Sequence, residues 1–136
     1  MLIRPLTEAD ITDDYVKWWQ DKEFIRYLET KTMTKEKAIN HIRGCSGCFL
    51  YAVEVDGVHV GNVKVKDGDL SIIIFPPYRG KGYATAAILQ MTELVGGRVT
   101  AGVRSGNLGS LRAFEKAGFV KRGKRQDVVL LENRRT

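Results

Sequence analysis

A glycine-rich turn between a strand-like run and a helical pattern is the stretch of this sequence best suited to chemistry. The apolar, β-branched run Ser71–Phe75 predicts a buried central strand, which two prolines end because proline cannot donate to a sheet. The turn Arg79-Gly80-Lys81-Gly82 follows, and Tyr83–Val95 carries apolar residues at helical spacing. A glycine turn that opens a helix presents free N–H groups and the positive end of the helix dipole. The sequence therefore predicts a phosphate or pyrophosphate site here, where Arg79 and Lys81 add positive charge.

Two common phosphate-binding motifs do not match this turn. A P-loop needs Ser or Thr after its Gly-Lys pair, whereas Gly82 follows Lys81 here. A dinucleotide-binding fingerprint needs a third glycine where this sequence has Thr85, and the chain is too short for two mononucleotide-binding halves. A basic surface turn without a ligand remains the alternative interpretation.

Two motifs, in order along the chain, resemble those of the GNAT acetyltransferase superfamily. Arg79–Ala84 is similar to its Arg/Gln-x-x-Gly-x-Gly/Ala signature, and Asn107–Phe119 is similar to its Asn-x-x-Ser/Ala…Glu-Lys-x-Gly-Phe stretch. In that family the first motif binds the pyrophosphate of acetyl-coenzyme A, and the second lies along the pantetheine arm. Asn107 and Gly118 fit plain helix caps as well. The resemblance implies acetyl-coenzyme A as co-substrate, bound by Ile74, Phe75, Arg79, Gly80, Lys81, Gly82, Tyr83, Ala84, Thr85, Asn107, Ser110, Phe114 and Lys116.

Acetyl transfer to an amine needs a proton acceptor, an N–H donor for the thioester oxygen and, less strictly, an acid for the leaving thiolate. The resemblance implies that the oxygen is met by a backbone N–H near Ile74 or Phe75. It makes Asp69, at the start of the central strand, the leading candidate for the base, with an ordinary turn residue as the alternative role. Glu54 and His59 on neighbouring strands are weaker candidates.

The sequence departs from the family pattern at Phe114, where many relatives carry a tyrosine that protonates the coenzyme A sulfur. Phenylalanine cannot donate a proton, so Ser110 or a water takes this role, or the thiolate leaves unassisted. The second motif resembles the branch that contains ribosomal-protein N-terminal and nucleotide-amino-sugar acetyltransferases. By this resemblance Trp18 lines an acceptor pocket and Glu29 holds a cationic acceptor, with core packing as the alternative role of Trp18.

We therefore expect acetyl transfer to a primary amine of a small molecule, with an amino sugar as first candidate. The alternatives are a peptide N-terminus as acceptor and a coenzyme A-binding module with impaired catalysis. The resemblance also implies that a homodimer can form through edge strands.

Composition places the 136-residue chain among ordinary globular proteins, with 43% hydrophobic and 28% charged residues. We expect a single acetyltransferase domain over residues 1–136. No apolar run reaches membrane-span length and Met1–Pro5 lacks a signal-peptide core, so we expect a cytoplasmic protein without a membrane partner. The net charge of +6 suits an anionic ligand such as coenzyme A, and its spread along the chain argues against nucleic acid.

The two cysteines, Cys45 and Cys48, form a CxxC after a predicted helix. A thioredoxin-like motif would follow a strand, and a zinc site that included His41 would lack a fourth ligand. We therefore expect two free cysteines and no metal.

Periodicity and turn signals predict an α/β (α+β) chain. The expected strands are Leu2–Leu6, Phe49–Val55, Val58–Lys66, Ser71–Phe75, Arg98–Val103, a strand that begins at Phe119, and Asp127–Glu132. The expected helices are Ile11–Gln20, a short one from Asp21 to Leu28, Lys35–Arg43, Tyr83–Val95 and Leu108–Ala117. This order is that of the GNAT fold, which implies a mixed, mostly antiparallel sheet of about six to seven strands flanked by about four to five helices.

Overall fold

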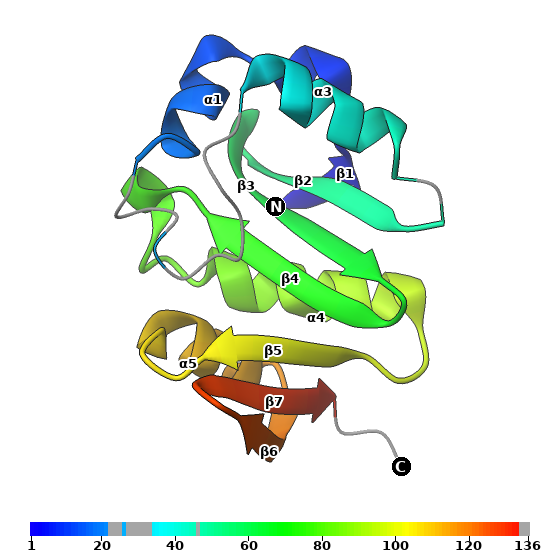
Figure 1. Cartoon of the computed structure of the whole chain (residues 1–136), viewed down its shortest axis with the longest axis vertical. Coiled ribbons are helices and arrows are strands. Elements are labelled where there is room, and N and C mark those ends of the chain that lie inside the picture. Colours follow the sequence, from blue (N-terminus) through cyan, green and yellow to red (C-terminus); the bar gives the residue numbers. More distant parts are fainter. Residues whose placement is uncertain (22–25, 27–33, 46, 134–136) are drawn as a thin grey trace.

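A seven-stranded sheet organises the computed structural model, which describes residues 1–21, 26, 34–45 and 47–133 (Figure 1). Across the sheet the order is β1-β2-β3-β4-β5-β7-β6, and among the described strands only β4 and β5 pair in parallel. The strands are β1 (Leu2–Pro5), β2 (Phe49–Val55), β3 (Val58–Lys66), β4 (Asp69–Ile74), β5 (Thr100–Arg104), β6 (Phe119–Arg125) and β7 (Val128–Asn133).

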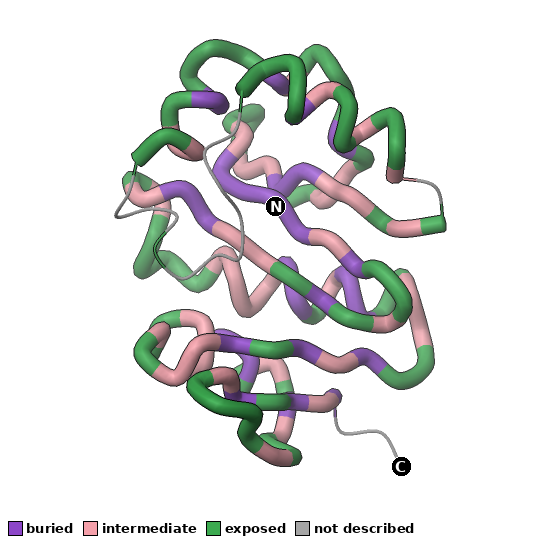
Figure 2. Tube along the Cα trace, in the orientation of Figure 1, coloured by how far each residue is buried: buried purple, intermediate pink, exposed green. Residues whose placement is uncertain are grey.

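Helices cover the two faces of the sheet unequally. On one face, α1 (Asp13–Trp18) and α3 (Lys35–Arg43) pack over β1 to β3. On the other face, α4 (Tyr83–Val95) and α5 (Leu108–Lys116) cover the central and C-terminal strands. Figure 2 shows buried residues running along the central strands between these layers. Since successive strand residues point to opposite faces, the same sheet contributes side chains to both cores.

Neighbouring residues of β4 illustrate this division. Ile72 packs against the larger core with Ile88 and Met91 of α4, while Ile73 packs against the smaller core beside α1 and α3. The sequence reads as a continuous apolar run because both faces of this strand are covered.

Most expected elements are confirmed, with shifts of one or two residues at their ends. Lys35–Arg43 and Tyr83–Val95 form the expected helices, and the Thr34 hydroxyl caps the first by accepting from the Lys37 amide at 3.2 Å. The first helix is shorter than expected, since the Thr12 hydroxyl caps it by accepting from the Tyr15 amide. The helix expected from Asp21 to Leu28 lies almost entirely outside the described residues.

The cysteine prediction is wrong in one respect. Cys45 and Cys48 form a disulfide, with their Cα atoms 5.6 Å apart, because the chain turns back from α3 into β2 at this point. Within the described ranges, no cluster of three or more potential metal ligands occurs. None of the described helices is long and apolar enough to cross a membrane.

The strands β4 and β5 meet only at their first residues. Their single register pair is Asp69 with Thr100, and the Thr100 amide donates to the carbonyl of Gly68 at 2.9 Å. Beyond this pair the two strands separate, whereas β4 stays paired with β3 from Asp69 to Ile74. The separation leaves one side of β4 without a neighbouring strand.

Candidate active site

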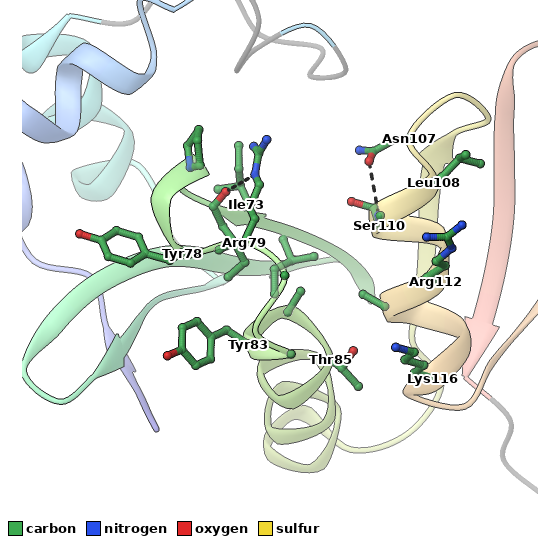
Figure 3. Close-up of a pocket in the computed structure, with 18 of the residues that line it drawn as sticks. Ile73, Tyr78, Arg79, Tyr83, Thr85, Asn107, Leu108, Ser110, Arg112 and Lys116 are labelled. Atoms are coloured by element: carbon green, nitrogen blue, oxygen red, sulfur yellow. Dashed lines mark hydrogen bonds between the residues drawn. The ribbon is translucent and has the colours of Figure 1, made fainter.

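A cavity of about 810 Å³ opens where β4 and β5 separate (Figure 3). One wall consists of residues 72–74 at the end of β4, followed by the glycine turn and the first residues of α4. The opposite wall consists of residues 106–110 and the exposed side of α5. The two segments that the sequence singled out as motifs therefore face one another across one cavity of a size typical for small-molecule sites.

The glycine turn is shaped to leave backbone N–H groups open to the cavity. Gly80 and Gly82 have φ of +77° and +81°, and no atom lies within 4 Å of a Cβ built on either residue. Gly82 caps α4 without a side-chain hydrogen bond. In the described part of the chain, the amides of Tyr83, Ala84 and Thr85 have no backbone acceptor. These donors and the helix dipole make the turn a fitting cradle for a phosphate group.

The free edge of β4 presents one further backbone donor. The Phe75 amide donates to the carbonyl of Val60 at 2.8 Å, so it is already satisfied by β3. Because amide direction alternates along a strand, the Ile74 amide points to the opposite side, where β5 has separated. Of the two oxyanion donors expected from the sequence, the structure therefore leaves Ile74.

Arg79 holds the end of β4 through a side-chain hydrogen bond. Its Nε donates to the Ile74 carbonyl at 2.9 Å, and burial lowers the pKa of the guanidinium, which stays charged at neutral pH. Arg79 also lines the cavity. The same side chain thus fixes the end of β4 and adds positive charge near the glycine turn.

The start of α5 contributes polar groups to the opposite wall. The Asn107 side-chain oxygen accepts from the Ser110 amide at 3.3 Å, which caps the helix. The side-chain nitrogen of Asn107 (Nδ2) and the Ser110 hydroxyl make no hydrogen bond with any other described residue, and both residues line the cavity. Capping and ligand binding are therefore compatible roles for Asn107.

Asp69, the expected base, does not line the cavity. It lies five residues before Ile74, a separation of roughly 16 Å along a strand. Its carboxylate instead accepts a hydrogen bond from the Thr100 hydroxyl at 3.0 Å. The structure gives it a strand-pairing role at the end of β4 where the sheet is closed.

Several other expected residues also lie outside the described lining. Phe114 is 2% exposed and packs edge-on against Phe119, so it belongs to the core. Trp18 stacks on Phe75, with ring centroids 6.1 Å apart. The exposed Lys81 is absent from the lining, and Glu29 lies outside the described residues.

The two weaker base candidates have other partners. Glu54 accepts from the Arg4 Nε at 3.3 Å. The His59 Nε2 lies 2.7 Å from the Asn62 side-chain oxygen, and the Asn62 amide in turn donates to the Tyr15 hydroxyl at 2.9 Å. This buried network belongs to the smaller core, and none of its members lines the cavity.

The expected binding residues that the cavity does bring together are Ile74, Arg79, Gly80, Gly82, Tyr83, Ala84, Thr85, Asn107, Ser110 and Lys116. Sequence reasoning missed Asp21 and Arg26, which reach the cavity from the segment between α1 and α3 and carry no sequence signal for this. It also missed Leu108 and Arg112, although helical spacing from Lys116 points to both of them.

Comparison with known proteins agrees with this geometry. Residues 1–120 match a family model described as an acetyltransferase (GNAT) domain. The SPbeta prophage-derived uncharacterized N-acetyltransferase YokL of Bacillus subtilis (strain 168) is 36% identical over 90 residues, which make up 57% of this chain and 51% of that protein. The chain thus spans about half the length of this curated relative.

Two solved structures share the fold at low sequence identity. The aminoglycoside acetyltransferase AAC(6')-Ib, in complex with coenzyme A and kanamycin, has a TM-score of 0.80 at 17% identity, covering 98% of this chain and 94% of that one. Spermidine N-acetyltransferase from Vibrio cholerae, in complex with coenzyme A and spermine, has a TM-score of 0.81 at 18% identity, covering 96% of this chain and 93% of that one. At these identities the likeness establishes the fold.

Proposed function

The chain belongs to the GNAT acetyltransferase family, and from this premise we propose that it transfers an acetyl group from acetyl-coenzyme A to a primary amine of a small molecule. The observation that carries the proposal is that the glycine turn, the free edge of β4 and the start of α5 line one cavity. We propose further that residues 1–136 act as a single domain. The cytoplasmic location stays a prediction. The Cys45–Cys48 disulfide argues against it, because disulfides are rare in reducing compartments.

The lining residues suit coenzyme A. The N–H groups at the start of α4 and the charge of Arg79 would hold a pyrophosphate, and the open glycine turn lets it approach the backbone. The Asn107 Nδ2 would donate to a carbonyl of the pantetheine arm, which would run along α5. The bound co-substrate would supply the acetyl thioester.

The residues of the chain would then stabilise the charges that develop during transfer. The Ile74 amide would donate to the thioester oxygen as it gains negative charge. The Ser110 hydroxyl, on the opposite wall, would donate to the leaving sulfur. A thiol has a pKa of about 8.5, so this assistance is the least demanding part of the reaction.

The acceptor must lose a proton before it attacks, because a free alkyl amine has a pKa of about 10. Asp21 is the sole carboxylate in the described lining, and we propose that it attracts the protonated amine, which then releases its proton to solvent water before it attacks. We also propose that the acceptor contacts Trp18, which stacks on Phe75, and Glu29. The ligands named with the two solved relatives, kanamycin and spermine, are both amines, which supports an amine acceptor.

Among amines, we propose an amino sugar first and a peptide N-terminus second. A coenzyme A-binding module without catalysis is the competing function. The specific observation in its favour is that Asp69, the expected base, does not line the cavity, and that Phe114 stands where many relatives carry a proton-donating tyrosine.

The first experiment is calorimetric titration of the purified protein with acetyl-coenzyme A, with adenosine diphosphate as a control. Tight binding of the co-substrate is expected, followed by release of free thiol when amino sugars are added. Binding without thiol release over amino sugars, polyamines and peptides would establish the binding module instead. Absence of binding at low salt would overturn the proposed function.

A further inference from the structure

We propose that Lys64 and His41 form an amine–imidazole pair outside the cavity, at which acetyl thioesters such as acetyl-coenzyme A acetylate Lys64 without any contribution from the cavity. The inference goes beyond the proposed function, because it concerns a modification of this chain and not the turnover of an acceptor. Its basis is the contact between two basic side chains that come from different elements.

The pair joins α3 to β3. The Lys64 Nζ lies 3.3 Å from the Nε2 of His41, which belongs to the last turn of α3. An ammonium group can only donate, so the imidazole Nε2 accepts from it, which places the proton of the neutral ring on Nδ1. The lone pair of Nε2 therefore points at the amine, where it can take up a proton.

The surroundings of Lys64 disfavour its charged form. Lys64 is half-buried, and its neighbours in register, Leu50 of β2 and Ser71 of β4, are both neutral. Burial and the nearby charge of Lys66 lower the pKa of the Lys64 amine from its ordinary value. A lower pKa means a larger fraction of neutral amine, and the neutral amine is the form that acts as a nucleophile.

His41 is neutral for the same reasons. Partial burial and the charges of Lys64 and Lys66 lower the pKa of its imidazole, so the ring is an unprotonated base at neutral pH. Within the described ranges, neither Lys64 nor His41 forms an ion pair with a carboxylate. Asp69, which lies opposite Lys66 in register, accepts a hydrogen bond from the Thr100 hydroxyl.

The acetylation step balances with the thioester as the sole co-reactant. The ammonium group first loses one proton to solvent, and the neutral Nζ then attacks the carbonyl carbon, which forms an N–C bond. The His41 Nε2 takes a second proton from this nitrogen as the tetrahedral intermediate collapses. The C–S bond breaks, and the leaving thiolate takes a proton from the imidazolium or from water. The products are acetyl-lysine and free thiol.

The test exposes the purified protein to S-acetyl-N-acetylcysteamine, a small thioester that lacks the nucleotide for which the cavity is proposed. A protease that cleaves after acidic residues releases residues 57–67, so mass spectrometry compares Lys64 with Lys66 within one peptide. We expect Lys64 to react about tenfold faster than Lys66, which is less than a general base provides in an enzyme, because the thioester is not held in place. Lys124, exposed on β6, should react as slowly as Lys66.

The matched variant is His41→Gln, whose side-chain oxygen still accepts from Lys64 but cannot take up its proton. In H41Q the rate at Lys64 should fall to the rate at Lys66, and an unchanged circular dichroism spectrum shows that the variant is folded. The second variant, Lys66→Gln, changes an exposed residue and keeps the imidazole. It should slow Lys64 by about twofold, the size expected for one screened surface charge.

Equal rates at Lys64, Lys66 and Lys124 in the wild-type protein would overturn the inference, and so would a fast reaction of Lys64 in folded H41Q. If H41Q does not fold, K66Q decides, because an unchanged or faster reaction of Lys64 there would also overturn the inference. Each of these outcomes is independent of the proposed function, which the titration with acetyl-coenzyme A tests.

Discussion

At the start of β4, Asp69 pairs in register with Thr100 of β5, and the two side chains are joined by a hydrogen bond of 3.0 Å. At the end of the same strand, five residues later, Ile74 has no partner on β5 and lines the cavity. The strand keeps its pairing with β3 over its whole length. The difference between the two ends is therefore the loss of one neighbour.

This comparison shows how a regular sheet leaves room for a cavity. Buried backbone groups are almost always paired, so an amide released from a sheet ladder needs another acceptor. At the open end the Ile74 carbonyl accepts from the Arg79 Nε, and the Ile74 amide has no partner on β5. At the closed end the Thr100 amide donates to the Gly68 carbonyl, and the Asp69 carboxylate accepts from the Thr100 hydroxyl.

The largest effect is expected from a substitution in the glycine turn beside the open end of β4. Gly82→Glu places a carboxylate in the phosphate cradle, and we expect the affinity for acetyl-coenzyme A to fall more than about 100-fold, through repulsion and loss of space. Calorimetric titration measures this.

The control for this substitution is Gly57→Glu in the turn between β2 and β3. Gly57 has φ of +80° and, like Gly82, no atom within 4 Å of an added Cβ, so the backbone strain is matched. This variant should bind normally. Normal binding by Gly82→Glu would contradict the phosphate role of the turn.

The second prediction concerns Gly61 of β3, which packs against the end of β4. A Cβ on Gly61 would lie 2.9 Å from the Ile74 Cδ1 and would collide with the Ile73 carbonyl. Gly61→Ala should lower the free energy of unfolding by about 1–3 kcal/mol, as overpacking does, and should also weaken binding of the co-substrate. Urea unfolding measures the first effect. Gly123→Ala, whose Cβ would meet only Leu130 Cδ1 at 4.0 Å, should be close to neutral.

A third substitution loosens the brace on β4. Arg79→Lys keeps the positive charge and loses the directed Nε bond to the Ile74 carbonyl. We expect kcat to fall about tenfold, in line with the loss of one charge-assisted hydrogen bond, and KM for acetyl-coenzyme A to change less. Steady-state kinetics separate the two parameters. A raised KM at unchanged kcat would show that Arg79 acts through binding of phosphate alone.

The smallest expected effect concerns the closed end. Asp69→Asn keeps an oxygen that can accept from the Thr100 hydroxyl, so stability should change by less than about 0.5 kcal/mol. Since Asp69 lies away from the cavity, kcat/KM should stay within about threefold and its pH profile should keep its shape. A 100-fold loss together with loss of the acidic limb of the profile, where a base becomes protonated, would establish Asp69 as the base after all.

Local signals predicted much of the fold. Asn107 caps its helix as expected, and Thr34 is a residue type that commonly caps a helix, as it does here. Asp-Gly pairs are typical of two-residue hairpin turns, and Asp56-Gly57 and Asp67-Gly68 have positive φ at all four residues. These features depend on a few neighbouring residues, so the sequence displays them directly. The same holds for the glycine turn at the start of α4.

The sequence by itself therefore determined the glycine turn that opens α4, the succession of strands and helices, and the two motifs that carry the family resemblance. Only the tertiary structure decided that Phe75 gives its amide to β3, that Asp69 sits at the closed end, and that Asp21 and Arg112 join the cavity. The physical reason is that a turn or a cap is specified by adjacent residues, whereas the neighbour of a strand edge comes from elsewhere in the chain. Where β4 and β5 separate, that neighbour is missing, and the site forms there.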